Sequence, residues 1–344
     1  MTDAWYDPDH FPELRDRPPW VMQEMISSEP SLVERIVGSC DPSAVALLCK
    51  GAGPLAIVGC GTSEHGALGV AEMLREAGIS ALTRDGLEAA LEPQTGGTVV
   101  GVSHEGGTWA TVEALKAARA AGRPTALVTA RPEAAAAAQA DAVLATPEVD
   151  RSWCHTIGYT SPFTAGLALA GRPEAGAVRS LLDAGVAMRA QAAEIAADLG
   201  GSARLIIIGS GADRIAAREL TLKIEEASHI PTSMRDLETF LHGHIPACDE
   251  TTGLVLIAAD RRGGSKRDER VEALERAGRR VGIRCHTLQA PPAPDGLPAG
   301  AGALLASAAP LQWLALELAA ARGVNPDLIR REQEPYREAA AEHK

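Results

Sequence analysis

The stretch PLAIVGCGTSEHGALGVAEMLREAG, residues 54–78, decides the fold. It begins with an apolar run at 55–58 that is too short for a helix. A glycine turn at 59–61 follows, and from Ser63 onward apolar residues recur at the spacing of a helix face. A strand, a glycine turn and a helix in this order are typical of the repeating unit of parallel sheets.

The same order recurs along the chain. Residues 98–122, TVVGVSHEGGTWATVEALKAARAAG, supply a strand at 99–102, a turn and a helix, and buried strands are predicted at 124–130 and 141–147. Residues 203–227, ARLIIIGSGADRIAARELTLKIEEA, restart the pattern, and 270–288 resembles 111–129 in period and content. A duplication of this length predicts two similar α/β domains, each a parallel sheet with helices on both faces.

Composition narrows the class of protein. A chain of 344 residues is too long for one ordinary core, and its net charge of −12 argues against a duplex nucleic-acid partner. We expect no apolar run as long as the roughly 18 residues of a membrane span, and no signal peptide. The six cysteines form no CxxC pair and read as reduced thiols. These features predict a cytoplasmic protein with no membrane partner.

The glycine turn at 59–61 does not fit a nucleotide cofactor. A dinucleotide fingerprint needs a glycine or alanine at its sixth position, which is Glu64 here, and no GxxxxGK[ST] loop occurs. His242 and His244 form an HxH pair without a third ligand in view, which is weak evidence for a metal. We therefore expect neither a cofactor nor a metal site.

Polar side chains gather on the turn at 103–108. Because turns after parallel strands lie at the sheet edge that binds ligands, and helix N-termini attract anions, this turn favours a phosphate or carboxylate. Ser103 and Thr108 would donate from short side chains beside free backbone N–H groups. The alternative is that each hydroxyl simply caps a helix. Their occurrence together with Gly106 and Gly107 favours a ligand.

These motifs resemble the sugar isomerase (SIS) domain, in which a CGTS turn and an SQSGET-like turn hold the phosphate of a sugar. The likeness extends to the isomerase half of glucosamine-6-phosphate synthases. Residues 20–36 look like the helix that precedes that half, residues 216–258 like its catalytic helix and loop, and residues 324–336, more loosely, like its C-terminal tail. The resemblance covers roughly residues 20–336.

The resemblance implies two tandem SIS domains, each a doubly wound, mainly parallel five-stranded sheet in a flavodoxin-like αβα sandwich. We expect an N-terminal arm and helix at 1–36, a first SIS domain at 37–180, a linker helix at 181–201, a second SIS domain at 202–322 and a tail at 323–344. One active site would form between the domains and be completed by a second subunit of a homodimer. We expect no glutamine-hydrolysing domain.

The resemblance also assigns the substrate-binding residues. The phosphate-binding residues would be Thr62, Ser63, Ser103, His104, Glu105, Gly106 and Thr108, and the sugar contacts His155 and Thr156. His104 and Glu105 stand where the family has Gln and Ser. A carboxylate beside a phosphate costs energy, so Glu105 points outward, or the ligand is not a plain 6-phosphate, or a cation lies between them.

Glu219, Lys223 and Glu226 share one face of a predicted helix. On most helices this spacing is a solvated ion pair, but the flanking residues here are apolar. By resemblance, Glu226 moves a proton between C1 and C2, Lys223 stabilises the enediol oxygen, and Glu219 is a further glutamate of that helix. His242 would open the sugar ring. Arg330 lies near the position of the family's Schiff-base lysine and would instead clamp an anionic group.

We therefore expect a phosphosugar aldose–ketose isomerase acting on an amino-sugar phosphate of the glucosamine-6-phosphate/fructose-6-phosphate type. An amino-sugar-phosphate deaminase would use a similar intermediate and is the first alternative. A sugar-phosphate-binding protein without turnover is the second.

Overall fold

The computed structural model describes residues 15–39, 53–93, 96–172 and 174–342. The chain divides into two compact units. Unit 1 comprises Met1–Ser27, Arg151–Thr156 and Ser180–Glu332, and unit 2 comprises Ser28–Asp150, Ile157–Arg179 and Gln333–Lys344. Cys40 and Cys49, two of the predicted reduced thiols, lie outside the described residues; Cys60, Cys154, Cys248 and Cys285 are free thiols.

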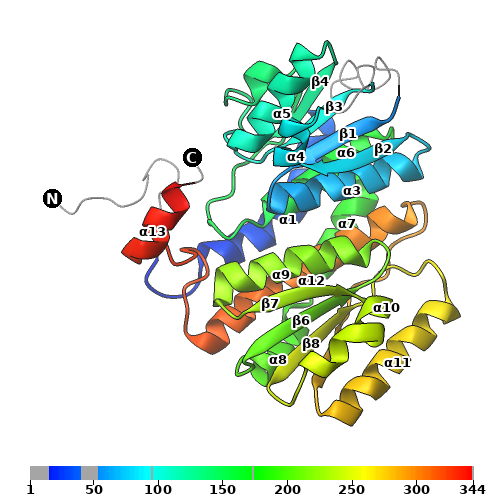
Figure 1. Ribbon diagram of the computed structural model, residues 1–344, viewed down its shortest axis with the longest axis vertical. Helices are drawn as coiled ribbons and strands as arrows, with labels where there is room; N and C mark the ends of the chain where they lie inside the picture. Colours follow the sequence, from blue (N-terminus) through cyan, green and yellow to red (C-terminus); the bar gives the residue numbers. More distant parts are fainter. Residues whose placement is uncertain (1–14, 40–52, 94–95, 173, 343–344) are drawn as a thin grey trace. The chain divides into compact units, whose positions relative to one another are not determined.

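Unit 2 contains a parallel sheet (Figure 1). Its strands are β1 (Leu55–Gly59), β2 (Ala81–Asp85), β3 (Val99–Val102), β4 (Thr125–Thr129) and β5 (Ala142–Ala145), in the order β2-β1-β3-β4-β5. This is the flavodoxin-like order, in which the chain reverses direction beside the first strand. The predictions of strands at 55–58, 99–102, 124–130 and 141–147 are confirmed, whereas β2 was not predicted.

Helices cover both faces of this sheet. They are α3 (Thr62–Glu76), α4 (Gly86–Leu91), α5 (Trp109–Ala120) and α6 (Ile157–Leu169), with a short 3₁₀ turn at Ala137–Gln139. Val58 and Val99 pack with Leu115 of α5 on one face. Because side chains alternate along a strand, Ile57 points to the opposite face, the side on which α3 packs.

Unit 1 also contains a parallel sheet. Its strands are β6 (Arg204–Gly209), β7 (Thr232–Asp236), β8 (Thr252–Ile257) and β9 (Arg284–Leu288), in the order β7-β6-β8-β9. The α/β class with parallel sheets is therefore confirmed. The prediction of five strands is wrong for this sheet, which has four in the part of the chain described. Residues 289–298, QAPPAPDGLP, follow β9, and proline cannot donate a ladder hydrogen bond.

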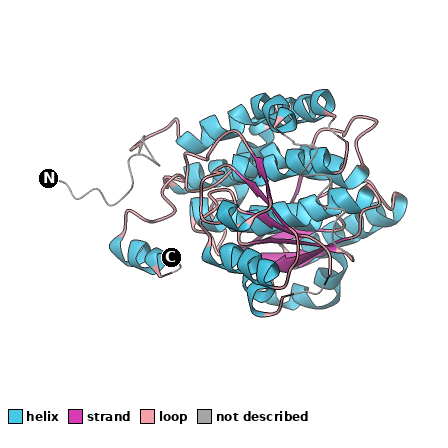
Figure 2. Cartoon of the chain, turned by 90° about the horizontal axis from the view of Figure 1, so that it is seen from above, coloured by secondary structure: helices cyan, strands magenta, loops and turns pink. Residues whose placement is uncertain are grey.

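The helices of unit 1 surround this sheet. They include α8 (Arg189–Leu199), α9 (Asp213–Ser228), the short α10 (Leu237–Thr239), α11 (Ser265–Val281) and α12 (Ala299–Arg322), together with a π turn at Phe240–His244 and a 3₁₀ turn at Ile245–Ala247. Figure 2 shows the strands in magenta with cyan helices packed on them. The remaining helices in the described part of the chain are α1 (Val21–Gly38), α7 (Ala175–Val186) and α13 (Glu334–Ala341).

The single linker helix predicted at 181–201 is wrong. The end of α7 and the whole of α8 occupy this stretch, with Ala187 and Met188 between them. The Met188 N–H donates to the Gly185 carbonyl at 3.0 Å and closes a turn there. Glycine is a poor helix former, which explains a break at this point.

The prediction that no apolar run is long enough to cross a membrane is also wrong. Among the described residues, α12 passes that test by length and composition. However, 89% of its most apolar window is buried inside the protein, where it packs against α8 and α9. Burial of that extent marks α12 as a core helix of unit 1.

Both sheets require glycine where the first strand meets its helix. A Cβ on Gly59 would lie 2.5 Å from the Ser63 carbonyl oxygen, and one on Gly209 would lie 2.3 Å from that of Asp213. Only glycine permits this approach, because real Cβ atoms do not come so close to backbone atoms. The positive φ angles of Gly61 (57°) and Gly211 (64°) complete the two turns.

We predict that Gly209→Ala destabilises the protein by about 2 kcal/mol or more, because the new methyl group displaces α9 from the end of β6. Urea unfolding followed by circular dichroism measures the change. Gly201→Ala is the matched control, since a Cβ there meets no atom within 4 Å. Equal stabilities of the two variants would contradict the packing argument.

Candidate functional site

Helix α9 carries a buried group of charges in unit 1. Lys223 is fully buried, and its Nζ lies 2.5 Å from Glu226 Oε2 and 3.8 Å from Glu219 Oε1. Glu219 is also fully buried, whereas the Glu226 side chain is 24% exposed. The structure therefore brings the three predicted residues together, and Glu226 is the member that solvent reaches.

The ammonium group of Lys223 stays charged despite its burial. Desolvation alone would lower the pKa of Lys223, but the neighbouring carboxylates, Glu226 first among them, raise it well above its usual value. A buried cation needs paired counter-charges of this kind, since an isolated charge would be too costly to bury. The arrangement fixes the direction in which the Glu226 carboxylate points.

The loop before residue 157 contributes polar groups to unit 1. Thr156 is fully buried, and its carbonyl accepts a hydrogen bond from Nε2 of Gln312, on α12, at 3.1 Å. Cys154 is buried beside α9, and burial raises the pKa of its thiol well above the usual value, so the thiol is uncharged. His155 is half-buried in the same loop. The sugar contacts predicted for His155 and Thr156 stay predictions.

The 103–108 turn of unit 2 begins where β3 ends. Ser103 is 1% exposed, and its hydroxyl makes no hydrogen bond in the structure. Thr108 is the N-cap residue of α5, but its side chain makes no capping hydrogen bond. Neither hydroxyl acts as a helix cap, so the capping alternative fails. An unsatisfied buried hydroxyl is costly, which points to a partner that the protein alone does not provide.

Gly106 shapes this turn. Its φ is 67°, and a Cβ would lie 2.7 Å from the Ala134 side chain. Its carbonyl accepts from the Ala136 N–H at 2.9 Å. Gly106 is thus required by the backbone of the turn, whatever the ligand.

His104 has a structural role in unit 2, because it forms hydrogen bonds within the protein. Its Nε2 accepts from the backbone N–H of Asp150 at 2.8 Å, which assigns the ring proton to Nδ1. Asp150 Oδ2 in turn accepts from the Gly158 N–H at 2.8 Å. The His104 N–H donates to Ser63 Oγ at 3.3 Å and joins the two glycine turns. Its Nε2 is therefore committed within the protein.

Thr62 and Glu105 complete the predicted phosphate site. Thr62 is buried at the first turn of α3, and Glu105 is half-buried. Their contacts with a ligand stay predictions.

His242 lies in the π turn after α10, away from α9 in sequence and on a different element. Its side chain is 77% exposed, and its Nε2 lies 3.0 Å from Glu238 Oε1. Glu238 also accepts from Arg270 Nε at 2.7 Å. The exposed imidazole is accessible to a ligand or to another chain, and its ring-opening role stays a prediction.

The segment that carries Arg330 is folded onto unit 1. Asp327 is buried and accepts from the N–H groups of Val21 and Met22, each at 2.8 Å, at the start of α1. Arg330 has a φ of 62°, an uncommon conformation for a residue with a Cβ. Arg331 stacks over Trp153, 4.8 Å from the ring centroid. This segment is not a solvated helix.

Sequence reasoning missed four buried aspartates: Asp150, Asp213, Asp260 and Asp327. Asp327 binds backbone N–H groups at the other end of the chain, and the N–H of Asp150 donates to the distant His104, contacts that no local pattern indicates. Asp260 did have a signal: it follows β8 at the position where Glu105 follows β3.

The comparisons with known proteins agree with the α/β fold. Residues 199–290, which hold β6 to β9, match the family description of the SIS domain. The chain contains a SIS domain. Its β6 strand and α9 helix, with Glu219, Lys223 and Glu226, fall inside the matched residues.

One curated relative is similar along most of the chain. It is the glutamine–fructose-6-phosphate aminotransferase (isomerizing) of Aeropyrum pernix, 30% identical over 352 residues, which cover 90% of this chain and 56% of the relative. The chain thus spans little more than half the length of that relative.

Solved structures share the fold. The C-terminal domain of glucosamine-fructose-6-phosphate aminotransferase from Francisella tularensis has a TM-score of 0.78 at 18% identity, covering 92% of this chain and 99% of that one. Tagatose-6-phosphate ketose/aldose isomerase from Escherichia coli has a TM-score of 0.77 at 18% identity, covering 93% and 97%. The fold is therefore that of the phosphosugar isomerases.

We predict that Lys223→Met destabilises the SIS domain by about 3–5 kcal/mol, because Glu219 would remain buried without its counter-charge. Adding Glu219→Gln should recover part of the loss. Urea unfolding measures both variants.

Lys116→Met is the matched control for this substitution. Lys116 pairs with Glu113 at 2.7 Å on the exposed face of α5, where an ion pair contributes about 1 kcal/mol or less. A Lys223→Met variant as stable as this control would contradict the buried-charge argument.

Proposed function

We propose that the chain is a phosphosugar aldose–ketose isomerase. Its substrate class is an amino-sugar phosphate or the corresponding ketose phosphate, of the glucosamine-6-phosphate/fructose-6-phosphate type. The observation that carries the proposal is the α9 group, in which a buried ammonium holds a carboxylate that solvent reaches.

Glu226 is the proposed base. Interconversion of an aldose and a ketose requires removal of a proton from C2 or C1 and its return to the other carbon through an enediol. A single carboxylate does both steps when it is held still beside the two carbons. The contact with Lys223 provides this support, because it holds one oxygen of Glu226.

Lys223 itself acts as a positioning residue in this proposal. The sequence suggested that it stabilises the enediol oxygen, but its side chain has no exposed surface that a sugar oxygen would contact. It therefore acts through Glu226, and Glu219 balances its charge from the buried side.

The phosphate is proposed to bind at the 103–108 turn. The Ser103 hydroxyl lacks a partner, the Thr108 hydroxyl makes no cap bond, and the helix that follows presents its N-terminal N–H groups. Thr62, Ser63, Glu105, His155, Thr156 and Arg330 are proposed further contacts of the substrate, and His242 is the proposed ring-opening residue.

We also propose that the chain has two SIS domains in tandem and forms a homodimer. Two SIS domains in tandem would account for two parallel sheets whose first strands end in similar glycine turns, Gly59 and Gly61 in one, Gly209 and Gly211 in the other. A homodimer would give the exposed His242 ring a second chain to reach.

We predict that Glu226→Gln retains substrate binding and loses proton exchange between C1, C2 and solvent, since an amide cannot accept the carbon-bound proton. Deuterium wash-in from D2O, followed by NMR, measures the exchange directly. Glu225→Gln is the matched control: Glu225 is the neighbouring exposed residue of α9. Ammonia release from an amino-sugar phosphate would instead favour the deaminase alternative, and unchanged exchange in Glu226→Gln would falsify the role of Glu226.

We predict opposite effects of Ser103→Ala on stability and on binding. Removal of an unpartnered buried hydroxyl should leave the ligand-free protein as stable as before or more stable. Loss of a hydrogen bond to a charged phosphate costs about 1.5–3 kcal/mol, so KM should rise roughly ten- to a hundredfold while kcat changes little.

Ser307→Ala is the control, because the Ser307 hydroxyl is equally buried but donates to the Ala303 carbonyl at 2.9 Å. It should lose stability and keep its KM. Steady-state kinetics and thermal unfolding test both variants, and an unchanged KM in Ser103→Ala would remove the phosphate from this turn.

A further inference from the structure

The two sheets place equivalent residues at the ends of equivalent strands. In unit 2, Val58 of β1 pairs with Gly101 of β3, and in unit 1, Ile208 of β6 pairs with Leu256 of β8. The fourth residue after Gly101 is Glu105, and the fourth after Leu256 is Asp260. By strand register, Asp260 therefore holds the position in unit 1 that the proposed phosphate turn holds in unit 2.

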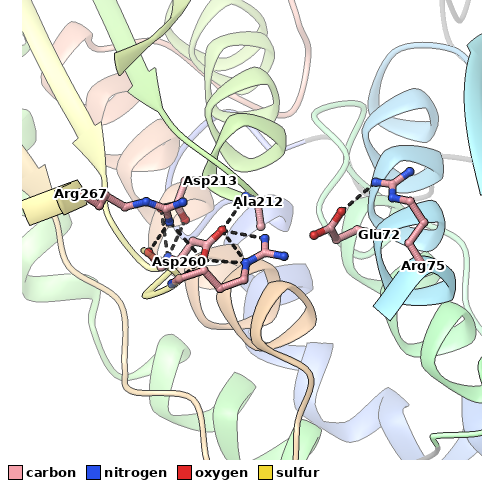
Figure 3. A network of polar contacts seen from close by, with 7 residues as sticks. Glu72, Arg75, Ala212, Asp213, Asp260 and Arg267 are labelled. Atoms are coloured by element: carbon pink, nitrogen blue, oxygen red, sulfur yellow. Dashed lines mark hydrogen bonds and ion pairs between the residues drawn. The ribbon is translucent and has the colours of Figure 1, made fainter. Parts of the chain in front are cut away.

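Asp260 is bound there as an anion. Its Oδ2 accepts from the backbone N–H of Ala212, the N-cap residue of α9, at 2.8 Å, and from Arg262 at 2.7 Å. Its Oδ1 accepts from the Arg262 N–H at 3.0 Å and lies 3.1 Å from Arg267. Figure 3 shows Arg267 and Ala212 beside the Asp260 carboxylate. Two guanidinium groups and a helix N-terminus are the usual donors of an anion site.

The glycine turn of unit 1 is closed by this carboxylate. A Cβ on Gly211 would lie 2.3 Å from Asp260 Oδ2 and 2.6 Å from the Arg267 side chain. A Cβ on Gly61, the matching glycine of unit 2, would meet no atom of the described residues within 4 Å. The chain itself therefore fills the turn of unit 1, whereas no described residue fills the matching point of unit 2.

Charge in the closed turn also opposes a second anion. The Asp260 side chain is fully buried, and burial alone would raise its pKa, but hydrogen bonds from Arg262 and Ala212 bring the pKa to about 2. Asp213 is buried next to it and accepts from the Asp260 N–H at 3.0 Å. Burial, with the nearby charge of Asp260, raises the pKa of Asp213 to about 7. A phosphate entering here would displace one carboxylate and face another.

We propose that Asp260 is a built-in anion that occupies the anion-binding position of unit 1, so that this turn takes no phosphate or carboxylate ligand. If the phosphate binds at the 103–108 turn, as the proposed function requires, the chain binds one anionic group, and binds it there. Arg262 and Arg267 belong to the internal anion and are not available to substrate.

Asp260→Ala in the full chain tests the proposal with inorganic phosphate as the probe. The substitution is made in a Ser103→Ala background, which weakens phosphate binding at the proposed site of unit 2. We expect the double variant to melt at a lower temperature in chloride and to be restabilised by phosphate at matched ionic strength. At about 100 times the dissociation constant, phosphate should shift the unfolding equilibrium about 100-fold. Ser103→Ala alone should gain nothing comparable.

Two controls separate opening of the turn from loss of charge. Asp260→Asn keeps the turn filled and should show no phosphate effect. Asp198→Ala removes an exposed acid that contacts Arg284 and His286, and should show only the small effect of net charge. Equal responses of Asp260→Ala, Asp260→Asn and Asp198→Ala would overturn the proposal.

A second measurement decides the matter if Asp260→Ala does not fold. Equilibrium dialysis of radiolabelled phosphate, at a concentration near the dissociation constant of the wild-type chain, should give no more than one phosphate per chain and much less in Ser103→Ala. A phosphate that remains on Ser103→Ala, and that Arg262→Ala or Arg267→Ala releases, would show that the turn of unit 1 is open. Failure of the wild type to bind phosphate would count against the proposed function, not against Asp260 as the internal anion.

Discussion

The close approach of a helix to the end of its parallel strand is the constraint on which both units depend. Gly59 and Gly209 permit it, because any Cβ at these positions would collide with the backbone of the next helix. The approach aims the helix N-terminus at the strand ends. It also sets the angle at which α9 leaves the sheet, and so determines which of its side chains are buried.

Burial on α9 then decides the chemistry that its residues can perform. Lys223 and Glu219 have lost all contact with solvent, and only Glu226 keeps part of its surface. The desolvation free energy of a buried charged triad offsets most of the attraction between its charges, so the triad stabilises the fold little. Its value lies in the fixed orientation of one carboxylate, which general base catalysis on carbon requires.

Much of the architecture follows from local sequence. Short apolar runs located β1, β3, β4 and β5, the first two before glycine turns, and the spacing of Glu219, Lys223 and Glu226 placed them on one face. Sequence patterns did not reveal β2, whose residues are mostly not buried and show no apolar run. The resemblance to SIS domains implied a fifth strand in the sheet of unit 1, and the predicted linker helix joined the end of α7 to α8. Prolines follow β9 and a glycine lies near the end of α7, and both depart from those expectations.

The hydrogen-bond partners of individual polar residues were harder to predict than the strands and helices. His104 was interpreted as a ligand residue, yet its Nε2 binds the N–H of Asp150, 46 positions along the chain. Such partners are set by tertiary packing, which no window of sequence contains. The unpartnered hydroxyl of Ser103 is likewise visible only when every neighbour is in place.

The interleaving of the two units has a consequence for biosynthesis. Asp327 binds the first turn of α1 across 306 positions, and the core helix α12 comes late in the chain. Residues 21 to 327 must therefore all be synthesised before unit 1 closes around its core. Until then the face of α9 that packs against α12 lacks its cover, and contacts so distant in sequence form slowly. Such a nascent chain has most to gain from chaperones that hold it until α12 and Asp327 have been made.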